Sequence, residues 1–105
     1  MVKKKVTIPK LIFDEEGHAK ITTHNDNVYT VRKLSDGEYL GVTSAGSEVD
    51  AINTLIAISL VEPAMTKQQV KTELYDGDLI FLSRTLSNYY TESVSFLESM
   101  DDEQI

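Results

Sequence analysis

The chain has 105 residues, which is enough for one domain that folds around its own hydrophobic core without disulfides or structural metals. It contains no cysteine, so disulfides, cysteine-ligated zinc and thiol nucleophiles are excluded. Its formal net charge of -7 argues against nucleic acid as a partner, because binding to the phosphate backbone depends on Lys and Arg side chains.

The first part of the chain, residues 1–33, carries β-strand signals. Residues 6–8 and 11–13 are short apolar runs separated by Pro9, which a sheet tolerates only at an edge or a bend. Residues 14–17 predict a turn that ends in glycine, which readily adopts a positive φ. No stretch near the start resembles the apolar region of a signal peptide, so we do not expect secretion.

Two stronger strand candidates follow. Residues 19–23 and residues 28–32 flank a cluster of turn-forming residues at 24–27. In the second candidate Tyr29 and Val31 face one side, and the other three residues face the opposite side. These segments predict a small antiparallel meander of two or three strands, which would be marginal alone and should pack on the helices.

Residues 34–46 predict a short helix that ends near Thr43. Ser35 can cap its first turn, and Glu38 stands at the third helical position, which is the spacing of a capping box. The glycines in this stretch weaken a helix, each by about 1 kcal/mol where it lies in the interior. We therefore expect one short helix here and a loop after it.

The most apolar stretch of the chain, residues 49–61, predicts a central helix. Its apolar residues recur at helical spacing and fill most of the circumference, which is typical of a buried helix. Ser47 can cap its start, with Asp50 three residues on, and Pro63 ends it because the residue before a proline leaves helical space. At about 1.5 Å per residue the helix is too short to cross a bilayer, so we expect no membrane partner.

Two further helices are predicted after Pro63. Thr66 and Gln69 have capping-box spacing at the start of a short helix. An Asp-Gly-Asp turn at residues 76–78 precedes the last helix, which should run to about Ser95, and a carboxylate of this turn should cap it. The turn does not predict a calcium loop, because the twelfth position counted from its first aspartate is a serine rather than a glutamate.

We therefore predict a single α+β domain over residues 1–105. A small N-terminal antiparallel β-meander (1–33) precedes a bundle of three or four helices (34–95), and an acidic tail (96–105) follows. Apolar residues at spacings of three and four should join these helices in one core. The expected core residues are Ile52, Leu55, Ile56, Leu60, Val70, Leu79, Leu82 and Leu86.

The sequence contains no visible motif for catalysis, cofactor binding or metal binding. The only histidines, His18 and His24, lie in or beside expected turns and lack a partner at metal-ligand spacing. No nucleophile elbow surrounds a serine, and no glycine-rich phosphate loop joins a strand to a helix. We therefore expect a non-enzymatic protein with no catalytic residues, no cofactor and no metal, in a binding or assembly role.

The order of the short motifs resembles a known family. In residues 60–86 a helix ends in Val-x-Pro, a Thr-capped helix follows, and Gly-Asp-Leu opens the next helix. The phrase Tyr-Thr-Val-Arg-Lys-Leu-Ser-Asp-Gly-Glu-Tyr at residues 29–39 stands ahead of them. Over residues 28–90 this order is similar to that of the tail assembly chaperones of long-tailed bacteriophages and related prophages.

The resemblance implies a chaperone made in the cytoplasm of the bacterial host while phage tails assemble. Such proteins bind the tape measure protein, help to recruit the major tail protein around it, and are absent from the mature virion. Two alternatives remain open. One is a structural tail component that stays in the virion, and the other is a small ligand-binding or regulatory domain.

The partner-binding surface is expected among apolar residues at or beyond the end of the core, because aromatic and methionine side chains adapt to varied apolar partners. The alternative is that Tyr89 and Phe96 complete the core. The lysines near the start of the chain and the carboxylates at its end also predict weak head-to-tail homo-oligomers. The candidate contact residues are Tyr89, Tyr90, Phe96, Leu97 and Met100.

Overall fold

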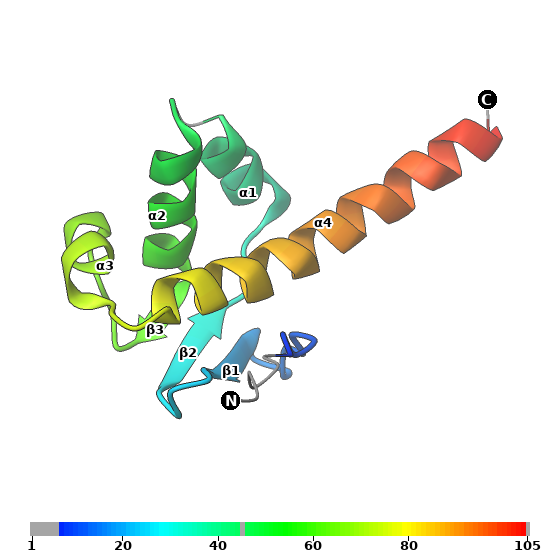
Figure 1. Cartoon of the computed structure of the whole chain (residues 1–105). Helices are drawn as coiled ribbons and strands as arrows, with labels where there is room; N and C mark the ends of the chain where they lie inside the picture. The colour runs from blue at the N-terminus through cyan, green and yellow to red at the C-terminus, as the bar shows by residue number, and fades with distance from the viewer. Residues whose placement is uncertain (1–6, 45, 105) are drawn as a thin grey trace, which may run out of the picture.

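The computed structural model describes residues 7–44 and 46–104, with side chains as far as Glu92. It confirms the predicted α+β fold, since helices pack on a three-stranded antiparallel sheet and the last helix is the longest element (Figure 1). In chain order the elements are β1 (His18–Thr22), β2 (Val28–Arg32), α1 (Asp36–Thr43), α2 (Glu48–Ser59), β3 (Leu60–Glu62), α3 (Lys67–Glu73) and α4 (Asp78–Gln104).

The strands β1 and β2 form the predicted hairpin. Ala19 pairs with Val31 and Ile21 pairs with Tyr29, and all four side chains are buried. As predicted, the other residues of β2 face the opposite side, where Val28 is exposed. The hairpin therefore contributes one apolar face to the core.

The third strand differs from the sequence prediction. The sheet is completed by β3, in which Leu60 pairs with Val31 of β2. The apolar runs before β1 form no strand between residues 7 and 13. Pro9 has no N–H for a ladder, and this segment instead buries Leu11 in the core.

The strand β3 also shortens the central helix. α2 ends at Ser59 rather than at Val61, because Leu60 adopts an extended backbone (φ -68°, ψ 125°) and pairs with β2. The buried side chains of α2 lie on one face, whereas Val49 at its start is 66% exposed. The expected burial of this helix is thus confirmed for one face only.

The predicted starts of α1, α2 and α3 are confirmed. Ser35 with Glu38 and Thr66 with Gln69 form capping boxes, in which each side chain accepts a hydrogen bond from the other residue's backbone N–H at 2.9 to 3.2 Å. Ser47 accepts one from the N–H three residues on at 3.1 Å. These bonds satisfy N–H groups that have no partner inside the helix, so they fix where each helix begins.

The predicted core is largely confirmed. It lies between the sheet, α2 and α4, and it also includes Phe81. Two of the expected residues, Ile52 and Leu79, are only partly buried at its edge. The expected residues that are buried are Leu55, Ile56, Leu60, Val70, Leu82 and Leu86.

The last helix is longer than predicted. α4 ends at Gln104 instead of about Ser95, so the expected acidic tail continues the helix. Its first half crosses the body, and its second half projects away from the sheet and the other helices (Figure 1). Among the described residues no helix is both long enough and apolar enough to span a membrane.

We predict that Ile56→Ala lowers the free energy of unfolding by about 2–5 kcal/mol, because Ile56 is fully buried and its truncation leaves a cavity. Val49→Ala, on the exposed side of the same helix, should change it by less than about 0.5 kcal/mol. Urea denaturation followed by circular dichroism measures both. Equal effects of the two substitutions would contradict the orientation of α2.

Candidate functional site

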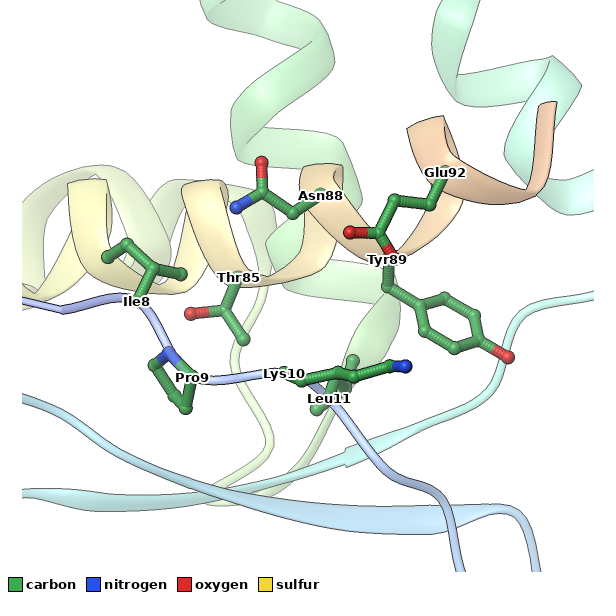
Figure 2. Close-up of a pocket in the computed structure, with 8 residues that line it drawn as sticks. All are labelled: Ile8, Pro9, Lys10, Leu11, Thr85, Asn88, Tyr89 and Glu92. Carbon is green, nitrogen blue, oxygen red and sulfur yellow. The ribbon is translucent and has the colours of Figure 1, made fainter. Parts of the chain in front are cut away.

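The segment before β1 crosses one face of α4 without forming a strand. Figure 2 shows Pro9 and Lys10 running beneath the helix. The segment is held by buried Leu11 and by Phe13, whose ring meets that of Tyr89 edge-on with 5.0 Å between ring centres. Its passage leaves two hollows along α4, and Ile8 lines both.

The first hollow, of about 160 Å³, lies between this segment and the middle of α4 (Figure 2). α4 contributes Thr85, Asn88, Tyr89 and Glu92 to its lining. These side chains combine an aromatic ring with hydroxyl, amide and carboxylate groups. The hollow therefore offers hydrogen-bonding groups beside apolar surface.

The second hollow, of about 430 Å³, lies at the start of α4. Phe81 and Ile80 give it apolar surface, and Ile80 is 54% exposed. His24 and Arg84 add polar groups. Open apolar surface with a few polar groups beside it is typical of a binding site.

Both hollows lie on the same face of α4. The lining residues of α4, from Ile80 to Glu92, recur at spacings of three and four, as does Gly77 just before the helix, and this is the spacing of one helical face. The segment around Ile8 bridges this face. We call this surface, from Gly77 to Glu92 with Ile8 and His24, the α4 groove.

A buried carboxylate fixes the start of the α4 groove. Asp78, the first residue of α4, is almost completely buried. Its oxygens accept hydrogen bonds from the side chains of Asn25 at 2.9 Å, Asn27 at 2.7 Å and Tyr29 at 2.8 Å. The predicted cap is thereby corrected, because these oxygens bind side chains of the hairpin rather than N–H groups of the helix.

The hydrogen bonds keep this carboxylate charged. Burial by itself would raise the pKa of Asp78, but the side chains of Asn27 and Asn25, then those of Thr23 and Tyr29, together hold it below its ordinary value. Burial, the hydrogen bond to Asp78 and the charge of Asp78 raise the pKa of Tyr29 to about 12. Tyr29 therefore remains a donor to Asp78 at neutral pH.

His24 lies against the start of α4. Its Nε2 is 2.8 Å from the carbonyl oxygen of Asp76, and its ring centre is 5.6 Å from that of Phe81. Gly77 has a φ of +91°, and a Cβ there would come within 3.0 Å of the His24 ring, so glycine is needed at this position. In the part of the chain that the structure describes, no three His, Asp or Glu side chains are grouped as metal ligands.

The two tyrosines expected at the partner surface lie in different environments. Tyr90 is buried, its hydroxyl accepts a hydrogen bond from the N–H of Leu34 at 2.9 Å, and its ring stacks on Tyr39. It presents no free surface to a partner. Tyr89 is half-buried and lines the first hollow of the α4 groove. Three candidates lie in α4 beyond the described side chains: Phe96, Leu97 and Met100.

We compared the chain with protein-family models, with curated proteins and with solved structures, and none of them matches it. Its function is therefore argued from the α4 groove and from the order of its sequence motifs.

We predict that Asp78→Asn lowers the free energy of unfolding by about 2–3 kcal/mol, because a hydrogen bond to a charged group is lost in a buried site. Asp76→Asn is the matched control, since Asp76 is exposed and asparagine tolerates its positive φ of 56°. Thermal unfolding measures both variants. A destabilisation as large in Asp76→Asn would show that turn geometry, not the buried carboxylate, matters.

The stabilisation by Asp78 should depend on pH. Because the pKa of Asp78 is lower in the folded chain than the value of about 3.9 in the unfolded chain, its contribution is present above that pH. It is lost as the pH falls through the folded value. The difference in unfolding free energy between the native chain and Asp78→Asn should therefore shrink when the measurement is repeated in acid. A constant difference would contradict the lowered pKa.

Proposed function

We propose that the chain is a non-enzymatic tail assembly chaperone of a long-tailed bacteriophage or prophage, which binds the tape measure protein and helps to recruit the major tail protein. The observation that carries this proposal is the form of α4. One helix bears a groove along its first half and continues beyond the body (Figure 1). The order of motifs over residues 28–90 supports the proposal by resemblance.

The α4 groove suits an amphipathic helix as a partner. A tape measure chain is long and helical, and its apolar stripe needs cover before the tail assembles. A helix docks through side chains three and four residues apart, and the α4 groove is built at the same spacing. Ile80 and Phe81 offer apolar contact, and Arg84 beside them can pair with a carboxylate of the partner.

The projecting part of α4 extends this arrangement. Positions 96 and 100 follow Tyr89 and Glu92 at spacings of three and four on the same helix. On helical spacing, positions 96 and 100 therefore continue the line of the α4 groove, whereas position 97 is seven residues after Tyr90. A partner that covers both the α4 groove and the projecting part of α4 would make a modest, reversible interface. A chaperone requires such an interface, because it must leave its partner later in assembly.

The test is co-expression with the tape measure protein of the same phage. We expect the tape measure protein to become soluble and to co-elute with the chain in gel filtration. Ile80→Asn should weaken the complex about tenfold, because it removes apolar contact at the centre of the second hollow. Leu40→Asn is the matched control, since Leu40 is a 63% exposed apolar residue on α1.

The outcomes separate the function from the surface. If the tape measure protein is equally soluble without the chain and no complex elutes, the chaperone proposal is wrong. If a complex forms and Ile80→Asn and Leu40→Asn bind equally well, the α4 groove is not the contact. Mass spectrometry of purified virions tests the remaining point, because a chaperone should be absent from the mature particle and a structural tail component should be present.

A further inference from the structure

A polar hollow of about 450 Å³ lies on another part of the molecule, between the start of α2 and α3. α2 lines it with Ser47, Asp50 and Asn53, and α3 lines it with Lys67 and Lys71. Two lysines in one hollow are notable in a chain with a net charge of -7. One of them, Lys67, is already paired with Asp50.

Asn53 is the unusual group in this hollow. It is only 7% exposed, and its side-chain amide has no hydrogen-bond partner among the side chains and backbone of residues 7–44 and 46–92. A buried polar side chain normally has a partner. The amide atoms of Asn53 are not fully enclosed, because the hydroxyl of Ser59 is the enclosed side-chain atom that lacks a partner within the described residues. The Asn53 amide therefore reaches accessible space. Since Asn53 lines the hollow, a ligand there can supply what the fold does not.

Lys71 and the start of α2 supply further hydrogen-bond donors to the hollow, beside Gln68, whose amide can both donate and accept. Lys71 is exposed and forms no ion pair within the described residues. The first two N–H groups of α2, at Glu48 and Val49, precede the one that Ser47 caps and have no partner inside the helix. Because Lys67 offsets the charge of Asp50, the free donors favour a carboxylate as the ligand.

The chain carries a run of carboxylates that cannot reach this hollow in its own molecule. They lie at the end of α4, which four residues separate from the end of α3 and which is one helix of 27 residues. At about 1.5 Å per residue, the helix holds its end roughly 40 Å from its start. Figure 1 shows that end projecting on the side away from α3. The acidic residues are Glu98, Asp101, Asp102 and Glu103.

We propose that the hollow between α2 and α3 binds the acidic end of α4 from a second copy of the chain. The hollow and the helix end are two different surfaces, so the contact is head-to-tail and leaves a free hollow and a free helix end after each addition. It produces open chains of copies instead of a closed dimer. This contact does not depend on the proposed function.

The first test measures self-association by sedimentation velocity at low ionic strength, about 20 mM, and at about 500 mM, where exposed charges are screened. The native chain should form a series of oligomers at low salt and fewer at high salt. Lys71→Glu should weaken association about fivefold or more, because it places a negative charge in the hollow. Lys33→Glu is the matched control, an exposed lysine outside the hollow. Circular dichroism verifies that each variant is folded.

The second test uses two variants that are each defective at one surface. Lys71→Glu keeps its acidic helix end, and the double variant Asp101→Asn with Asp102→Asn keeps its hollow but has no charge that pairs with Glu at position 71. At a protein concentration where the native chain has only begun to oligomerise, each alone should remain monomeric. Mixed together they should form dimers and nothing larger, because only one productive pairing exists between them. The side-chain amide signal of Asn53 should shift in the NMR spectrum of the double variant when Lys71→Glu is added.

Several results would overturn the proposal. A native chain that stays monomeric at low salt excludes it. So does equal association of Lys71→Glu and Lys33→Glu, or larger oligomers in the mixture. If replacing Lys3, Lys4 and Lys5 with Gln abolishes association while Lys71→Glu does not, the acidic end binds the start of the chain instead. If an added acetate ion alone shifts the Asn53 signal and the chain stays monomeric, the hollow binds only small anions.

Discussion

The arrangement of the molecule depends on one buried charge, the carboxylate of Asp78. A carboxylate taken out of water is strongly unfavourable unless hydrogen bonds replace its hydration, and here Asn25, Asn27 and Tyr29 supply them. All three donors come from the β1–β2 turn and the start of β2. The first residue of α4 is therefore bound to the hairpin, which places His24 beside Phe81 and shapes the second hollow.

A second contact fixes α4 further along. The hydroxyl of Tyr90 accepts a hydrogen bond from the N–H of Leu34, just after β2, as Tyr29 within β2 binds Asp78. The two contacts hold the stretch of α4 from Asp78 to Tyr90 against the same strand. The first hollow extends to Glu92, and the backbone of α4 continues from there beyond the body (Figure 1). A partner bound in the α4 groove could therefore follow the backbone of α4 beyond the body.

The sequence was most informative where structure is local. The caps at Ser35, Ser47 and Thr66 depend on residues three positions apart, and all were predicted. The strand β3 was missed because the pairing of Leu60 with Val31 joins distant segments, and the whole apolar stretch has helical spacing.

The contacts of Asp78 could not be predicted either. Its hydrogen bonds join residues about fifty positions apart, so the sequence predicted only a turn and a helix cap. The sequence did contain one hint of these bonds. Asn25 and Asn27 both lie in the turn, and a turn alone does not require two asparagine side chains, so their amides were available to bind a buried carboxylate. The groove could not be predicted, since it depends on where residues 7–13 cross α4.

Three buried polar side chains, Asp78, Ser59 and Asn53, differ in whether they have a hydrogen-bond partner and in whether a ligand could reach them. Asp78 has donors from its own chain, and its burial is explained by the fold alone. The hydroxyl of Ser59 has no partner among the described atoms, but it is fully enclosed and lines none of the three hollows, so a ligand in them cannot reach it. Asn53 meets both conditions for contact with a ligand, because it lacks a hydrogen-bond partner within the described residues and it lines an open hollow. An unsatisfied group in contact with solvent-accessible space can be completed by another molecule at little cost to the fold, and this is why Asn53, rather than Ser59, indicates a site.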